Sequence, residues 1–249
     1  MSPASAKPRL DSHLVALGLA PSRERARAYV MAGRVLINGQ PANKAGTPVP
    51  PGAKVELKGP KAPFVSRGGL KLAHGLDHFG LDPKGLTCLD VGASTGGFTD
   101  CLLKRGATRV ICVDVGYGQL HWDLRRDERV RVVERCNARY LTEDETGGAV
   151  DAAVVDVSFI SLTLILPRVE ALIRPGGWLA VLVKPQFEVG KGQVGKGGVV
   201  RDPGLRQAAV DKITGHLSGL GLDVLGVTPS PVLGPKGNQE FLVAARTKG

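Results

Sequence analysis

The sequence has no apolar run long enough to cross a membrane. Its longest continuous stretches, such as residues 178–183 (WLAVLV), fall far short of the ~20 residues that a spanning helix needs, and the N-terminus has no apolar signal core. The four cysteines (Cys88, Cys101, Cys112 and Cys136) show no CxxC spacing, so neither a zinc site nor a disulfide framework is predicted. We therefore expect a cytoplasmic protein with no membrane partner and no metal.

Positive charge is concentrated in the first quarter of the chain. The whole sequence has 33 Lys and Arg against 23 Asp and Glu, but residues 1–62 alone carry ten against three. Residues 58–63 (KGPKAP) contain two prolines and no periodicity, which is typical of a linker. We predict a polyanion-binding domain over residues 1–59, a linker over 60–65 and a second domain over 66–249.

Two short helices are predicted at the start of the first domain. Leu10, Leu14 and Leu17 recur at helical spacing, and Gly18 ends the pattern. Ser22 is placed to cap a second helix over residues 23–33, which is rich in arginine.

A small sheet is predicted after these helices, because residues 34–43 (RVLINGQPAN) contain an Asn-Gly hairpin turn and residues 54–59 (KVELKG) add a strand. Over residues 8–58 this α+β sequence resembles the RNA-binding domain first described in the fourth protein of the small ribosomal subunit. The resemblance implies contact with structured RNA. It implies that five arginines bind phosphate groups: Arg9, Arg23, Arg25, Arg27 and Arg34.

The second domain alternates apolar runs with helical patterns, which predicts an α/β fold with a seven-stranded, largely parallel sheet covered on both faces. Ligands of such sheets bind beyond the carboxyl ends of the strands. The expected strands lie at residues 86–92, 109–115, 130–134, 151–159, 177–184, 222–228 and 240–246.

The first of these strands ends in a glycine-rich turn over residues 90–98 (DVGASTGGF), which does not match the GxGxxG pattern of dinucleotide sites. The next strand ends in Asp114, where an acid can accept the hydroxyls of a ribose. Together they resemble the S-adenosylmethionine site of the class I, Rossmann-like methyltransferases. The resemblance places Asp90 near the amino-acid end of the cofactor, Gly92 and Gly96 where they leave room for it, and Asn137 and Ala138 near the adenine.

Two lysines and two carboxylates are expected at one edge of the sheet. Asp156 ends the fourth strand, Lys184 the fifth, Glu240 begins the last, and Lys71 precedes the first. In this order they resemble the Lys-Asp-Lys-Glu tetrad of the FtsJ-like ribose 2′-O-methyltransferases.

That resemblance assigns Lys184 the central role in activating the ribose hydroxyl. Asp156 would adjust its charge state, while Lys71 and Glu240 orient the nucleophile. Two roles for Lys184 stay open: a neutral amine that removes the proton, or a cation that stabilises the forming alkoxide.

Almost the whole chain resembles the TlyA family of ribosomal RNA cytidine-2′-O-methyltransferases. The resemblance implies S-adenosylmethionine as cofactor and rRNA or ribosomal subunits as partner, with the large subunit expected and the small subunit open. Two alternatives are a non-catalytic ribosome-assembly factor, which predicts eroded motifs, and a membrane-lysing haemolysin, which predicts an amphipathic or spanning segment. The sequence shows neither feature.

Overall fold

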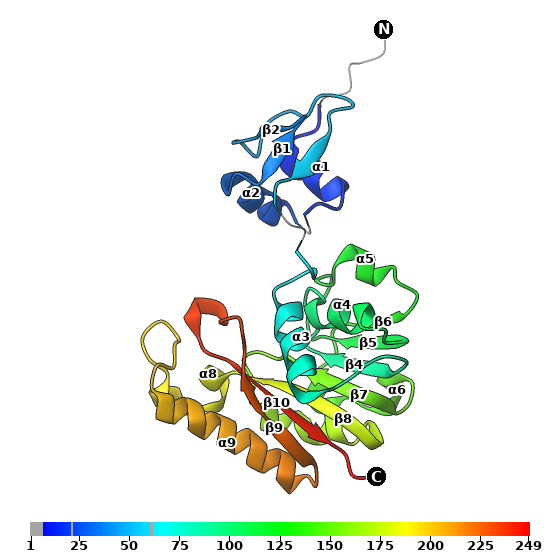
Figure 1. Cartoon of the computed structure of the whole chain (residues 1–249), viewed down its shortest axis with the longest axis vertical. Helices are drawn as coiled ribbons and strands as arrows, with labels where there is room; N and C mark the ends of the chain where they lie inside the picture. The colour runs from blue at the N-terminus through cyan, green and yellow to red at the C-terminus, as the bar shows by residue number, and fades with distance from the viewer. Residues whose placement is uncertain (1–6, 21, 60–61) are drawn as a thin grey trace. The chain divides into compact units, whose positions relative to one another are not determined.

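The computed structural model describes residues 7–20, 22–59 and 62–249, and the chain divides into two compact units, residues 1–62 and 63–249 (Figure 1). This division falls inside the predicted linker, of which residues 60 and 61 lie outside the described residues. The smaller unit has one hydrophobic core and the larger unit has two, one on each face of its sheet.

The smaller unit packs two helices on a short antiparallel sheet of order β2-β1-β3. The predicted Ser22 cap is confirmed, since its hydroxyl accepts the backbone N–H of Arg25. Leu17 does not join the apolar face as predicted: the first helix ends one residue before it, and Leu17 is 49% exposed. The elements are α1 (Leu10–Ala16), α2 (Arg23–Met31), β1 (Val35–Ile37), β2 (Gln40–Pro41) and β3 (Val55–Leu57).

The larger unit contains the predicted seven-stranded sheet, in the order β6-β5-β4-β7-β8-β10-β9. Strands β6, β5, β4, β7 and β8 run parallel, whereas β10 is antiparallel to both of its neighbours. Its strands are β4 (Thr87–Val91), β5 (Arg109–Val113), β6 (Val130–Val133), β7 (Val150–Val155), β8 (Ile173–Val183), β9 (Asp223–Pro229) and β10 (Phe241–Arg246). Its α-helices are α3 (Gly68–Phe79), α4 (Gly97–Lys104), α5 (Trp122–Arg125), α6 (Glu143–Thr146), α7 (Leu166–Glu170), α8 (Pro185–Glu188) and α9 (Pro203–Gly219).

Helices cover both faces of this sheet, as the continuous apolar strands predict. One core joins the strands to α3, α4 and α5, and the other joins them to α7 and α9 (Figure 1). Alternate residues of each strand enter opposite cores, as shown by Leu182 on the α3 side and Val183 on the α9 side. This alternation fixes the face on which each residue at a strand end lies.

The fourth strand is shorter than the apolar run that predicts it. Strand β7 ends at Val155, and Phe159, expected inside the strand, lies in a loop with a φ of 66° and is 91% exposed. A bulky residue in the left-handed region is strained, and this conformation turns the chain away from the sheet. Val157 and Ile160 of the same loop still pack against the core beside α7 and α9. Among the described residues no helix is long and apolar enough to cross a membrane.

Candidate active site

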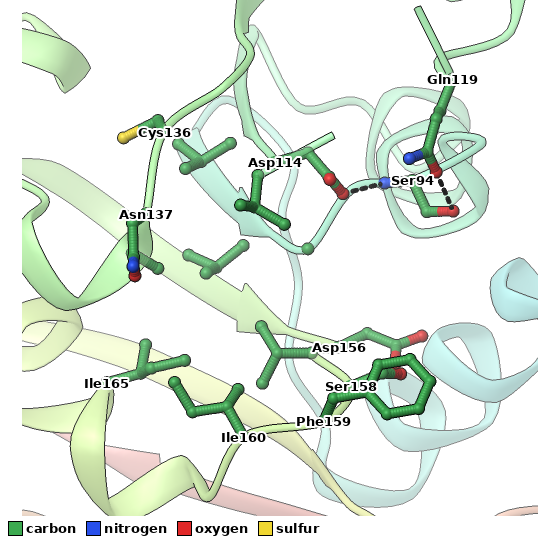
Figure 2. A pocket seen from close by; sticks show the side chains of 16 residues that line it. Ser94, Asp114, Gln119, Cys136, Asn137, Asp156, Ser158, Phe159, Ile160 and Ile165 are labelled. Carbon is green, nitrogen blue, oxygen red and sulfur yellow. Dashed lines mark hydrogen bonds between the residues drawn. The ribbon is translucent and has the colours of Figure 1, made fainter. Parts of the chain in front are cut away.

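A cavity of about 450 Å³ opens at the carboxyl ends of the central strands. It is lined by residues that follow β4, β5, β6 and β7, including Gly92, Asp114, Asn137, Ala138 and Asp156 (Figure 2). This is the position at which parallel α/β sheets bind ligands. Five of the ten residues predicted for the cofactor site and the tetrad therefore face one cavity.

Gly92 brings the backbone of the β4–α4 turn close to the neighbouring strand end. Its φ is 85°, and a Cβ there would lie 2.4 Å from the carbonyl oxygen of Asp156. Neither the conformation nor the space admits a side chain. The cavity wall at this point consists of bare backbone.

Asp114 is fixed by two backbone groups at one wall of the cavity. One carboxylate oxygen accepts the N–H of Ser94 at 2.8 Å (Figure 2), and the other accepts the N–H of Gly116 at 2.7 Å. Each carboxylate oxygen has a further lone pair, so the group can still accept bonds from two hydroxyls. Its arrangement fits the predicted role at a ribose.

Asp90 and Gly96 do not line the cavity. Asp90 is fully buried, one oxygen accepts the hydroxyl of Thr99 at 2.6 Å, and the other has no hydrogen-bond partner within the described residues. Burial raises the pKa of Asp90 to about 7. Gly96 serves packing instead, because a Cβ there would lie 2.3 Å from the side chain of Leu124.

Lys184 lies at the carboxyl end of β8, where its side chain is 9% exposed. Its Nζ lies 2.5 Å from Oδ1 of Asp156 and donates to the hydroxyl of Ser158 at 2.9 Å. A buried ammonium is costly unless such groups surround it. Only the Ser158 contact is a hydrogen bond: the Asp156 contact is an ion pair by distance, and Oδ1 of Asp156 has no hydrogen-bond partner among the described residues. The ammonium therefore has N–H groups left for a further acceptor.

Lys71 and Glu240 form the second predicted lysine–carboxylate pair. Lys71 Nζ lies 2.5 Å from Glu240 Oε2, and the side chains are 10% and 0% exposed. Gly234 packs directly against this carboxylate, since a Cβ there would lie 2.1 Å from Glu240 Oε1. The pair joins the helix that precedes the sheet to the start of its last strand.

Strand register brings these two pairs to the same face of the sheet. Phe241 pairs with Val183 in the antiparallel β10–β8 ladder. The next position of the ladder therefore places Glu240, just before β10, opposite Lys184, just after β8, and both lie on the α3 side. Asp156 has the same parity as Val154, which also belongs to the α3-side core. The four tetrad residues therefore meet at one edge of the sheet.

Three of the five predicted RNA-binding arginines in the smaller unit surround one buried carboxylate. Asp11 is 0% exposed, whereas Arg9, Arg23 and Arg27 each lie 3.2 Å from it and are 53–55% exposed. These arginines hold the pKa of Asp11 well below its usual range. No role was predicted for Asp11 from the sequence. Its position between Leu10 and Leu14, two buried residues of one helix, could have indicated a buried carboxylate.

The other two arginines flank an aromatic ring. The guanidinium of Arg25 lies 5.8 Å from the centroid of the Tyr29 ring, and that of Arg34 lies 5.3 Å from it. Cation–π contact restricts the positions of the exposed Arg25 and the half-buried Arg34 without neutralising them. The five arginines thus form two clusters, one around Asp11 and one around Tyr29.

Comparisons with known proteins match both units. Residues 64–247 match the FtsJ-like methyltransferase family, and residues 8–55 match the S4 domain. The chain is 48% identical to the 16S/23S rRNA (cytidine-2′-O)-methyltransferase TlyA of Mycobacterium tuberculosis, over 96% of this chain and 90% of that protein. It is 37% identical to Hemolysin A of Brachyspira hyodysenteriae, over 94% of this chain and 98% of that protein.

A solved structure agrees with these matches. The "Putative hemolysin from Streptococcus thermophilus" superimposes with a TM-score of 0.75 and 43% identity, covering 98% of this chain and 90% of that one. The similarity extends over both units of the chain and is not confined to the widespread methyltransferase sheet. The chain belongs to the TlyA family of FtsJ-like methyltransferases, with an S4 domain at its N-terminus.

Proposed function

We propose that this enzyme transfers a methyl group from S-adenosylmethionine to the 2′-oxygen of a cytidine in ribosomal RNA. The observation that carries the proposal is the ion pair between the buried Lys184 and Asp156, a residue that lines the cavity. Folding alone gives little reason to bury a lysine at the end of an apolar strand. Alkylation of a ribose hydroxyl gives that reason, because it requires a positioned charge beside the oxygen.

The cavity fits the cofactor in size and chemistry. S-adenosylmethionine is a nucleoside joined to an amino acid and has no phosphate, and a cavity of about 450 Å³ is in the usual range for such ligands. Asp114 would hold the ribose hydroxyls, and Asn137 and Ala138 would border the adenine. Gly92 would let the backbone approach the cofactor closely. The buried carboxyl group of Asp90, behind the cavity wall, would interact electrostatically with the cationic amino-acid end.

The cofactor supplies an electrophilic methyl group on a sulfonium. A ribose hydroxyl is almost fully protonated near neutral pH, so the site must bind the hydroxyl in line and stabilise negative charge as its proton leaves. The ion pair with Asp156 is made by the ammonium form of Lys184. An N–H that is not bonded to Ser158 is then the donor that would stabilise the forming alkoxide, which favours the cationic role of Lys184 among the two that the sequence leaves open.

Lys71 and Glu240 are positioning residues in this proposal. Their ion pair closes the α3 side of the site, and the Glu240 carboxylate is adjacent in register to Lys184. A second anion there keeps the edge electrically balanced, since two lysines face two carboxylates. The nucleophile therefore meets a fixed arrangement of charges that requires little reorganisation.

The S4 domain supplies affinity for rRNA. Its exposed arginines exceed the acidic groups around them, so positive charge is displayed to the phosphate backbone. An rRNA substrate also places the enzyme in the cytoplasm. The large ribosomal subunit is the expected substrate, and the small subunit is a second candidate.

Incubation with S-adenosylmethionine labelled on its methyl group tests the proposal. Separate large subunits, small subunits and naked rRNA are offered, and the labelled RNA is digested to nucleosides. The expected product is 2′-O-methylcytidine. Label on a base, or bound subunits without any label, would overturn the proposal; the second result would favour the assembly-factor alternative.

A further inference from the structure

A second cavity of about 270 Å³ adjoins the cofactor cavity. The two share Ser158 and Phe159 as lining residues, and Lys184 lines the second. A nucleoside whose 2′-oxygen faces Lys184 would therefore have its base within or beside this space. The volume suits one nucleoside rather than a longer segment of RNA.

The walls of this cavity are partly apolar and partly polar. Phe159 and Phe187 form an aromatic pair with ring centroids 5.1 Å apart, while Lys236 is an exposed cation among the lining residues. An apolar wall beside a few polar groups is the usual composition of a site for a planar, polar ring. The polar groups then decide which ring is held.

Most polar side chains of this cavity are already committed within the protein. Asn238 donates to the carbonyl of Gly198 at 2.8 Å and accepts the N–H of Val200 at 3.0 Å. The hydroxyl of Ser158 accepts a hydrogen bond from Nζ of Lys184. These groups hold the surrounding loops and the catalytic lysine in place.

Gln186 is different. Its side chain lines the cavity, yet its amide oxygen is enclosed and has no hydrogen-bond partner in the part of the chain that the structure describes. An enclosed amide without a partner costs free energy, and turning it toward a ligand breaks no bond made by that oxygen. Gln186 also lies two residues after Lys184, at the start of the short helix α8. Its position is thus coupled directly to the end of β8.

We infer that the carboxamide of Gln186 binds the base edge of the acceptor cytidine, with Oε1 accepting from the exocyclic N4 amine and Nε2 donating to N3. This inference rests on the proposed function and deepens it by naming a residue that recognises the base. A carboxamide matches this edge because it offers one acceptor beside one donor. Gln186 is a binding residue here, and Lys184 still acts on the ribose.

A double-mutant cycle between the side chain and the base tests the inference. Gln186→Leu keeps the bulk and removes the hydrogen-bonding groups. The rRNA substrate carries, at the position methylated by the wild-type enzyme, either cytidine or its analogue that lacks the N4 amine. Gln207→Leu, the same change on the exposed face of α9, is the matched control.

The wild-type enzyme and Gln207→Leu should lose about five- to a hundredfold in kcat/KM when the amine is removed, the range for a good base contact. On the cytidine substrate Gln186→Leu should have a kcat/KM lower than that of the wild type by a similar factor. The kcat/KM of Gln186→Leu should differ by less than about twofold between the cytidine substrate and the analogue. Its affinity for S-adenosylmethionine should match that of the wild type, which shows that the fold is retained.

Equal losses in the wild type and Gln186→Leu on removal of the amine would overturn this inference alone, because the methyl transfer itself would still be observed. Absence of any 2′-O label with unmodified RNA would overturn the proposed function and this inference with it.

Discussion

Both units pair basic side chains with carboxylates, but the basic groups are exposed in one unit and buried in the other. In the S4 domain the carboxylate of Asp11 is inside and three arginines are more than half exposed. In the methyltransferase unit Lys71 and Lys184 are themselves buried, with 10% and 9% of their side chains exposed, against 0% and 21% for their partners Glu240 and Asp156. A polyanion needs charge at the surface, whereas a reacting hydroxyl needs charge in a site from which water is excluded. The same ion-pair chemistry thus supports binding in one unit and transfer in the other.

Replacing the buried lysine should give the largest effect. We expect Lys184→Ala to lower turnover by on the order of a hundredfold or more, because it removes the positioned charge at the ribose oxygen. Affinity for S-adenosylmethionine should persist, and stability should hold, since no buried cation remains. Methyl-transfer kinetics measure the turnover, and titration with S-adenosylmethionine measures the cofactor affinity. Lys84→Ala, an exposed lysine outside the site, is the control.

Asp114→Ala should show the opposite pattern. It removes the carboxylate that faces the cofactor cavity, so we expect S-adenosylmethionine to bind more weakly by about tenfold or more while the tetrad stays intact. Calorimetric titration of the cofactor checks this. Near-normal turnover by a folded Lys184→Ala enzyme would contradict the tetrad mechanism, whatever the outcome for Asp114.

Reversing exposed charge in the S4 domain should act on RNA binding instead of chemistry. The double variant Arg23→Glu, Arg27→Glu should weaken rRNA binding by about tenfold or more and make the plot of log affinity against log salt shallower by about two. Binding measured from 50 to 200 mM salt provides the slope. An unchanged slope would show that these arginines serve Asp11 alone and contact no phosphate.

The pKa of Asp90 predicts a pH-dependent stability in the larger unit. Burial raises this pKa from 3.8 to about 7, so the folded state binds a proton that the unfolded state has released. The wild-type unit therefore loses stability as pH rises from about 4 to 7. Asp90→Asn keeps an acceptor for Thr99 but does not ionise. We expect its free energy of unfolding, relative to wild type, to be greater at pH 8 than at pH 5.

Asp11 should show the reverse dependence with a smaller amplitude. Its pKa is lowered, chiefly by the hydrogen bond from Arg9, so its contribution is fully present above about pH 4 and is lost progressively as pH falls from there through the lowered pKa of the folded state. Asp11→Asn should lower the melting temperature of the S4 domain by several degrees at pH 7 and by less at pH 3. A difference that is independent of pH would mean that Asp11 stabilises the domain through packing.

The sequence was sufficient to predict the helices and strands of the smaller unit and the seven strands of the larger one. Continuous apolar runs at regular spacing can be buried only in a covered parallel sheet, and Ser22 and the glycine turns mark element ends through local backbone chemistry. Where the prediction was wrong, tertiary packing decided: Leu17 follows the last helical turn, and Phe159 leaves the strand because the chain turns at the cavity rim. Hydrophobicity alone does not encode where a strand stops.

The candidate site also depends partly on the sequence and partly on the tertiary structure. The residue types and order of the tetrad are determined by the sequence, since the resemblance rests on motifs around Lys71, Asp156, Lys184 and Glu240. Only the tertiary structure decided how they pair, because strand register and the antiparallel β10 set which side chains share a face. The burial of Asp11 beneath three arginines likewise depends on segments far apart in the chain. The amide oxygen of Gln186, which has no hydrogen-bond partner among the described residues, depends on the shape of a cavity. Local sequence patterns carry no information about such contacts, since they follow from how whole elements pack.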